Sequence, residues 1–289
     1  MKRRLAELLK SNGIDCFGFL LLSACDITKK HLLDRVGIQH GSVVIFAMPY
    51  YTHACDGNKN LSAYALGKDY HLYFQLLSEK LLETLRKDFP ENRFAAFADH
   101  SPIDERMAAA KAGLGVLGKN GLLITEKYSS YVFLGEIVTD AVLETETREV
   151  RTCAECGACE AVCPRKTGEL EDCLSSVTQK KASLSAKEES AIRTYKTVWG
   201  CDLCQEVCPY TKNAKKRGTL YSPLSFFEKD ILSELSAEVL SQMDDEAFAS
   251  RAFSWRGREV ILRNLSLSET KNALTKKCKK QDFTSKDKP

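Results

Sequence analysis

The most constraining feature of this chain is the arrangement of its cysteines. The sequence has 12 cysteines. Eight of them form two runs and a single cysteine that lies between the runs. These are Cys153, Cys156, Cys159 and Cys163; Cys173; and Cys201, Cys204 and Cys208. The first run has the Cys-x2-Cys-x2-Cys-x3-Cys-Pro spacing of bacterial [4Fe–4S] proteins, in which the fourth cysteine ligates the neighbouring cluster. The pattern predicts two [4Fe–4S] clusters and a protein that transfers single electrons.

The crossing of the fourth cysteine assigns a ligand set to each cluster. One cluster is predicted to bind Cys153, Cys156, Cys159 and Cys208. The other cluster takes Cys163, Cys201 and Cys204, which leaves one position open. Cys173 lies between the two runs and is predicted to be the missing ligand.

Two other uses of cysteine fit the sequence less well. Disulfide frameworks are typical of small secreted chains, whereas this chain has 289 residues and its opening, MKRRLAELLKSNG, lacks the apolar run of a signal peptide. Structural zinc also binds Cys-x2-Cys pairs, but it requires neither two Cys-Pro endings nor a crossing partner. A cytoplasmic location is therefore expected. The other cysteines are expected to be buried thiols or bystanders: Cys16, Cys25, Cys55 and Cys278.

Composition allows a full-sized core without a membrane segment. Hydrophobic residues make up 44% and charged residues 28% of the chain, and no stretch approaches the ~20 apolar residues of a membrane span. The net charge of +3 does not by itself indicate a nucleic-acid partner. The lysine-rich end beyond about residue 269 is expected to be disordered.

The first 150 residues predict a layered α/β or α+β domain. Four short apolar runs read as buried strands: Phe17–Leu22, Val43–Met48, Phe94–Ala98 and Tyr131–Val138. Leucines and a tyrosine at helical spacing predict a helix over Asp69–Lys87. Helices between strands favour layers packed around a sheet. Beyond the cysteines, the ranges 231–243 and 245–265 are predicted to be helical.

The segment from Phe94 to Leu123 holds the second concentration of polar and glycine residues. Ser101, followed by Pro102, is predicted to cap a helix that ends at Gly113 and Gly115. Asp104 would complete a variant capping box. Asp99 has no such role and is a candidate catalytic carboxylate, although a turn residue is equally compatible with its position.

The glycines of this segment resemble a phosphate-binding loop only in part. Gly113, Gly115 and Gly118 precede Lys119 and Asn120, but they follow a predicted helix and lack the Walker spacing. A Rossmann site would need a strand–turn–helix context. Close backbone approach to a large flat cofactor and an ordinary turn both remain open.

Three blocks of sequence resemble the epoxyqueuosine reductase family. The first is SAYALGKDYH at residues 62–71. The second joins DHSP at 99–102 with ER at 105–106, KAGLG at 111–115 and GKN at 118–120. The third is the cysteine array, with GCDLCQEVCP at 200–209. The order of these blocks also matches the family.

The resemblance implies a cobalamin bound without its lower axial base and reduced by two [4Fe–4S] clusters. The substrate implied is the epoxide of epoxyqueuosine in a tRNA anticodon loop, which would yield queuosine and water. Asp99 occupies the position of the family's proton donor. A general acid needs a pKa near the working pH, which burial beside an apolar corrin face would favour. The cobalamin contacts implied are Tyr64, Gly67, Asp69, Gly118, Lys119, Asn120 and Asp202.

The sequence departs from the family at three points. His100-Ser101 replaces the usual Thr-Gly, and Ala63 replaces an arginine. Full-length members also continue into C-terminal helical repeats that bind tRNA, which would begin near Leu265 here. RNA is therefore expected to contact the lysine-rich end and four arginines: Arg251, Arg256, Arg258 and Arg263.

The expected fold class is α+β in four parts. These are a layered α/β cobalamin-binding and catalytic domain at 1–150, a bacterial ferredoxin-like double-cluster domain at 151–218, a short helical segment at 219–268 and a lysine-rich tail at 269–289. A monomer is expected that receives electrons from a low-potential donor such as ferredoxin or flavodoxin. Two alternatives stay open: a small-molecule corrinoid reductase similar to reductive dehalogenases, and a non-catalytic electron carrier. Bound corrin would separate the enzymes from the carrier, and binding of an anticodon stem-loop would separate the two enzymes.

Overall fold

An antiparallel sheet organises the first half of the chain in the computed structural model, which describes residues 1–164 and 173–269. Its strand order is β1-β2-β6-β3, and every neighbouring pair runs antiparallel. The strands are β1 (Phe17–Leu21), β2 (Ser42–Pro49), β3 (Phe94–Phe97) and β6 (Val132–Thr139). All four predicted strands are confirmed, with ends that differ by a single residue.

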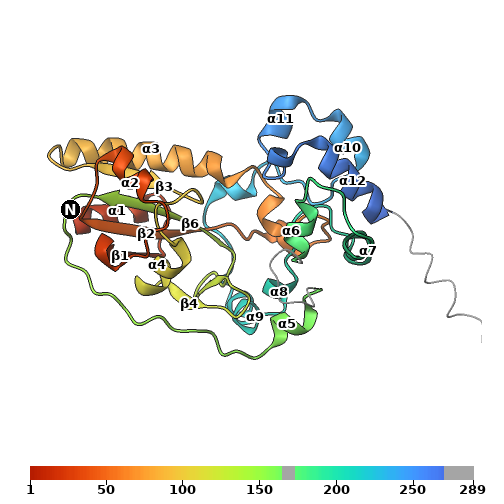
Figure 1. The fold of residues 1–289 in the computed structure, drawn as a ribbon, viewed down its shortest axis with the longest axis horizontal. Coiled ribbons are helices and arrows are strands. Elements are labelled where there is room, and N and C mark those ends of the chain that lie inside the picture. The colour runs from red at the N-terminus through yellow and green to blue at the C-terminus, as the bar shows by residue number, and fades with distance from the viewer. Residues whose placement is uncertain (165–172, 270–289) are drawn as a thin grey trace, which may run out of the picture.

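Helices cover both faces of the sheet, and the alternation along β2 shows why. Val44, Phe46 and Met48 join one hydrophobic core with α1 (Lys2–Ser11) and α3 (Tyr70–Asp88). Val43, Ile45 and Ala47 join a second core with α2 (Lys30–Val36) and α4 (Glu105–Lys111). Successive side chains of a strand point to opposite faces, so a wholly apolar β2 is buried on both sides. Figure 1 shows α3 lying across the sheet.

The helix predicted over Asp69–Lys87 is confirmed as α3. The side chain of Asp69 caps it by accepting a 2.9 Å hydrogen bond from the amide of His71. Helices α1 and α2 were not predicted from the sequence.

The start predicted for α4 is wrong. Asp104 is its N-cap and accepts hydrogen bonds from the amides of Arg106 and Met107 at 3.1 Å. Ser101 is buried instead, and its hydroxyl donates to the carboxylate of Glu136. That carboxylate comes from β6, so a tertiary contact overrides the local capping signal. Gly113 follows the helix with a φ of 83°, which confirms its predicted role.

Short elements make up the rest of the described chain. A two-stranded ribbon pairs β4 (Gly115–Leu117) with β5 (Leu123–Thr125). The helices are α5 (Ala158–Val162), α6 (Leu174–Thr178), α7 (Ala186–Tyr195), α8 (Leu203–Glu206), α9 (Pro209–Lys216), α10 (Ala237–Gln242), α11 (Asp245–Ala249) and α12 (Arg258–Glu269). Because the glycine-rich segment leads from α4 into β4, it lacks the strand–turn–helix context of a nucleotide loop.

The two long helices predicted near the C-terminus are wrong in extent. The first is shortened because the chain before α10 pairs with the segment around residues 60–66. There the amides of Leu232 and Leu235 donate to Leu66 (2.7 Å) and Asn60 (2.9 Å). The second is divided into α11 and α12 by Gly257, whose φ is 88°. The lysine-rich tail beyond Glu269 and Cys278 lie outside the described residues.

Residues from both halves of the chain share one core. Trp199, Leu220 and Phe253 are buried in the same cluster as α1 and α3, and the division at residue 150 stays a prediction. A long segment crosses from the sheet to α5 along one side of the molecule (Figure 1). No helix in the described ranges is long and apolar enough to span a bilayer.

Candidate active site

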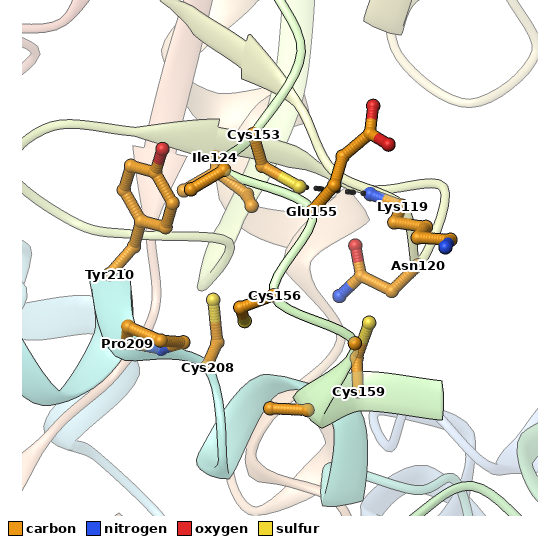
Figure 2. A pocket seen from close by; sticks show the side chains of 13 residues that line it. Lys119, Asn120, Ile124, Cys153, Glu155, Cys156, Cys159, Cys208, Pro209 and Tyr210 are labelled. Carbon is orange, nitrogen blue, oxygen red and sulfur yellow. Dashed lines mark hydrogen bonds between the residues drawn. The ribbon is translucent and has the colours of Figure 1, made fainter. Parts of the chain in front are cut away.

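Four of the predicted cluster ligands surround one cavity. Its lining includes Cys153, Cys156, Cys159 and Cys208, and it encloses about 430 Å³, part of it open to solvent. Figure 2 shows these four side chains around a common space. The cysteines come from the segment before α5, from α5 itself and from the start of α9, where Pro209 is the first helical residue. The structure thus brings Cys208 to the first run, as the crossing rule predicts.

The other four cysteines form a second group beside the first. Cys204 interacts electrostatically with Cys163, Cys173 and Cys159, and Cys201 interacts with Cys204 and Cys173. Burial raises the pKa of Cys204 to about 11 and that of Cys201 to about 12.

The chemistry of this donor set fits iron–sulfur clusters better than a mononuclear metal. Within residues 1–164 and 173–269, no three Cys, His, Asp or Glu side chains are arranged to hold one ion. A [4Fe–4S] cluster distributes its four thiolates over four iron atoms, so its cysteines surround a space and do not converge on a point. The cavity of the first group has that form.

The Gly118–Asn120 turn lies against the cysteines. The amide of Lys119 is 3.4 Å from Cys153 Sγ, as drawn in Figure 2, and the side chain of Asn120 hydrogen-bonds Cys204. Such donors tune the potential of a cluster. A Cβ at Gly118 would lie 2.3 Å from the Asn120 side-chain oxygen, so a larger residue there would displace the Asn120 side chain.

A larger cavity contains the candidate acid. It encloses about 1070 Å³, part of it open to solvent, and is lined by Tyr64, Asp69, Tyr70, His71, Asp99, Phe133, Gln179, Ala252 and Trp255. The rings of Tyr70 and Phe133 stack with centroids 3.8 Å apart. The hydrogen bond to Asp69, 2.7 Å long, raises the pKa of His71. The cavity thus combines an aromatic surface with polar groups that can carry charge, as ligand sites do.

The remaining predicted cofactor contacts, Gly67 and Asp202, are not among the residues that line this cavity. Asp202 is buried, and its carboxylate accepts hydrogen bonds from the hydroxyl of Ser62 and, at 2.7 Å, from the amide of Ala63. These bonds tie α8 to the segment that carries Tyr64. Gly200 packs so closely that a Cβ there would lie 2.9 Å from the Tyr64 ring. Gly67 faces the backbone of residues 227–229. The second cysteine group is therefore the one joined directly to the Asp99 cavity.

A pair of carboxyl groups holds the loop of Asp99. Asp99 has a φ of 61°, a left-handed conformation that costs energy for a residue with a side chain. Its amide donates a 3.0 Å hydrogen bond to Glu105, and Glu105 is hydrogen-bonded to Glu136. Glu136 is fully buried in β6. The loop is thus anchored to the central sheet through two carboxyl groups.

Burial and the neighbouring Glu105 raise the pKa of Glu136 well above its usual range. Two neighbouring carboxyls, one fully buried and one half-buried, cannot both ionise at low cost, so the protonated form of the pair is favoured. Sequence reasoning missed Glu136 and its contact with Glu105. A charged residue in the centre of a predicted buried strand was the available signal.

The pair should make stability fall as pH rises. Above the ordinary carboxyl pKa, the unfolded chain releases the proton that the folded protein still holds. The free energy of unfolding of the wild type should therefore fall relative to that of Glu136→Gln between about pH 5 and 8. The expected slope approaches about 1.4 kcal/mol per pH unit. Denaturant unfolding at several pH values measures this difference, with the exposed Glu259→Gln as control. Parallel pH curves for wild type and Glu136→Gln would show that the pair is ionised.

Three of the four arginines proposed for RNA have structural roles. Arg251 donates to the carbonyl of Asp230 at 2.6 Å, Arg258 to that of Met243 at 2.7 Å, and Arg263 to that of Lys180 at 2.8 Å. Arg256 differs, because its guanidinium lies 3.7 Å from the centroid of the Trp255 ring. Trp255 is 57% exposed and lines the Asp99 cavity.

Comparison with known proteins shows the family. Residues 34–100 match the family model described as epoxyqueuosine reductase QueG, DUF1730. The chain is 32% identical over 216 residues to epoxyqueuosine reductase of Gloeobacter violaceus, which covers 72% of this chain and 68% of that protein. The protein defined by this fold and these cysteines belongs to the epoxyqueuosine reductase family.

Other relatives are longer than the matched region. The enzyme of Lactococcus garvieae is 33% identical, with 69% of this chain and 58% of that protein covered. For the Listeria monocytogenes enzyme, identity is 36%, with 68% of this chain and 53% of the relative covered. The match thus spans little more than half of these two curated relatives.

Solved structures agree on the fold. Epoxyqueuosine reductase from Streptococcus thermophilus superposes with a TM-score of 0.72 at 24% identity, covering 93% of this chain and 80% of that one. An epoxyqueuosine reductase bound to an epoxyqueuosine-modified tRNA-Tyr stem loop gives 0.70 at 23% identity, with coverages of 92% and 80%. The mixed α+β class is therefore confirmed.

Proposed function

We propose that this chain is an epoxyqueuosine reductase, an oxidoreductase that converts epoxyqueuosine in a tRNA anticodon loop to queuosine. The observation that carries the proposal is the connection of the Asp99 cavity to the second group of four cysteines, which adjoins the first group, in a chain of this family. The reaction adds two electrons and two protons to the epoxide and releases its oxygen as water. Single-electron clusters can deliver those electrons in sequence.

The residues present fit the cofactors that this chemistry needs. Cys153, Cys156, Cys159 and Cys208 would hold one [4Fe–4S] cluster, and Cys163, Cys173, Cys201 and Cys204 would hold the other. Cobalamin would lie in the Asp99 cavity, where Tyr64 and Asp69 from the predicted contact set contribute to the lining. When bound and reduced, it supplies the electrons for opening the epoxide.

Lys119 and Asn120 fit a role beside the cysteines better than a role as corrin contacts, because the Lys119 amide and the Asn120 side chain hydrogen-bond sulfur. Gly118 belongs to the same turn, where its amide donates to the carbonyl of Leu122. Asp202 acts indirectly by holding the Tyr64 segment on α8. We retain the four-part division of the chain with a catalytic part at 1–150 and a double-cluster part at 151–218.

The protein's own part in the reaction is to supply a proton to the substrate oxygen and to hold the proton donor in position. Asp99 donates that proton from the loop above the cavity. The Glu105 carboxylate accepts a hydrogen bond from the Asp99 amide. This bond holds the backbone at Asp99 and so orients the Asp99 side chain. Tyr70 and Phe133 form a stacked aromatic wall that excludes water from one side. These roles match what an enzyme contributes when a cofactor carries the difficult step.

Trp255 and Arg256 are the best-supported contacts for RNA. Recognition of single-stranded RNA depends on bases stacked on aromatic rings or guanidinium planes. Trp255 is exposed at the rim of the cavity and already stacks with a guanidinium. A base next to the modified nucleotide could stack there while the modified base enters the cavity. The predicted tail contacts lie outside the described residues.

Trp255→Ala should therefore weaken binding of an epoxyqueuosine-containing anticodon stem-loop. Loss of a stacked base costs about 1–3 kcal/mol, or roughly 5- to 150-fold in Kd. Fluorescence anisotropy at several salt concentrations measures the affinity. Leu262→Ala removes a comparably exposed apolar side chain from α12 and serves as control. Unchanged stem-loop affinity in Trp255→Ala would place the RNA elsewhere, and no binding by the wild type at low salt would argue for a small-molecule substrate.

A further inference from the structure

A basic hollow adjoins the cavity of the first cysteine group. It encloses about 1050 Å³, including open space, between the β4–β5 ribbon, the segment before α5, and α9. Its charged lining residues are Arg148, Arg151, Arg217 and Glu126. Ile124 and Tyr210 line both the hollow and the cysteine cavity, so a single layer of side chains separates the two.

The positive charge of this hollow is available to a partner. All three arginines are exposed, and within the described residues no carboxylate forms an ion pair with Arg148 or Arg151. Arg217 donates to the backbone carbonyl of Glu126 at 2.7 Å, which leaves its charge uncompensated. Lys212 and Lys216 add exposed charge along α9. Arginine and tyrosine are also the residue types enriched in protein interfaces.

The position of the hollow suits electron entry and not substrate binding. Cys156 of the first group is exposed. The second group is the one joined to the Asp99 cavity, through Gly200 and Asp202. The two groups adjoin, because Cys159 interacts electrostatically with Cys204. In Figure 1, β4, α5 and α9 lie on one side of the molecule, whereas α10, α11 and α12 lie on the other. RNA bound at Trp255 would leave the hollow free.

We propose that this hollow, centred on Arg148, Arg151 and Arg217, is the docking site for an acidic, low-potential one-electron carrier protein of the flavodoxin or ferredoxin class. The proposal rests on the proposed function in that the first cysteine group must hold a cluster. In each encounter the reduced carrier loses one electron and the adjacent oxidised cluster gains it, with no bond formed or broken. Complementary charge across such a contact accelerates encounter and makes the rate sensitive to salt.

The test is reduction of the anaerobically purified, cluster-loaded chain by a reduced acidic flavodoxin, followed by stopped-flow absorbance of the clusters. Arg148→Glu/Arg151→Glu should lower the second-order rate constant roughly 10-fold or more at low ionic strength and should flatten its salt dependence. Reduction by dithionite, which needs no protein docking, should be unchanged. The control Lys30→Glu/Arg35→Glu makes the same charge change on exposed residues of α2 and should behave as wild type.

Each outcome decides the proposal. Equal flavodoxin rates in the two double variants, or a loss in both that reflects net charge alone, would overturn it. A hollow variant that reacts normally with flavodoxin but loses stem-loop affinity would reassign the surface to RNA. A chain without clusters would overturn both this proposal and the function. Normal flavodoxin kinetics in the wild type without conversion of epoxyqueuosine would instead overturn the function alone.

Discussion

Replacing Asp99 by asparagine should lower turnover by about 10²- to 10⁴-fold, the usual contribution of general acid catalysis. Asparagine keeps the size and polarity of the side chain but has no acidic proton to give to the epoxide oxygen. Loop geometry should survive, because the contact to Glu105 is made by the backbone amide of residue 99. Single-turnover formation of queuosine measures the chemical step apart from binding.

Two further variants and one binding measurement test whether loss of the acidic proton causes the lower turnover. Asp99→Glu restores the acid on a longer side chain and should recover part of the rate. Asp34→Asn makes the same chemical change on an exposed residue of α2 and should not alter turnover. Stem-loop affinity should stay the same in Asp99→Asn. A rate within a few-fold of wild type in Asp99→Asn would remove Asp99 from the role of proton donor.

Replacing Cys173 by alanine should remove or convert one cluster and leave the other intact. Cys173 is grouped with Cys201 and Cys204 by electrostatic interaction, whereas Cys153, Cys156, Cys159 and Cys208 surround a separate cavity. Iron content should fall from roughly eight atoms per chain toward roughly four, as expected when one of two [4Fe–4S] clusters is lost. Activity should be abolished, because the second group is the one joined to the Asp99 cavity.

Iron and sulfide analysis with electron paramagnetic resonance of the reduced protein distinguishes loss of one cluster from general damage. Cys16→Ala removes a cysteine outside the motif, whose thiol is largely buried and has a pKa raised to about 12 by that burial. It should keep full cluster content. Full content in Cys173→Ala would mean that another group completes the second cluster.

Local patterns predicted the sheet and the cysteine grouping well, for different reasons. Strand β2 is buried on both faces, so its apolar run is nearly continuous and its ends are clear. The cysteine groups follow from ligand chemistry, which constrains spacing regardless of the surrounding fold. Asp69, predicted at the start of α3, is its cap because capping is a local interaction.

The features that sequence reasoning missed are assembled from distant segments. The local sequence around Ser101 is typical of an N-cap. Its hydroxyl instead donates a hydrogen bond to Glu136, which lies 35 residues later. The Glu105–Glu136 pair exists only because β6 lies beside the start of α4. The basic hollow brings Arg148 and Arg151 together with Arg217, which comes from a distant segment of the chain. Gly118, Lys119 and Asn120 were assigned to the corrin, and only the folded turn shows that Lys119 and Asn120 hydrogen-bond sulfur.

The most direct test of this account is conversion of the modified nucleoside itself. The chain would be purified anaerobically with its clusters, supplied with cobalamin and a low-potential reductant, and incubated with a tRNA anticodon stem-loop carrying epoxyqueuosine. Mass spectrometry of the digested RNA should show queuosine, which has one oxygen atom fewer, and its formation should require both cobalamin and reductant. Unchanged epoxyqueuosine, in a protein with full cluster content and bound corrin, would contradict the account.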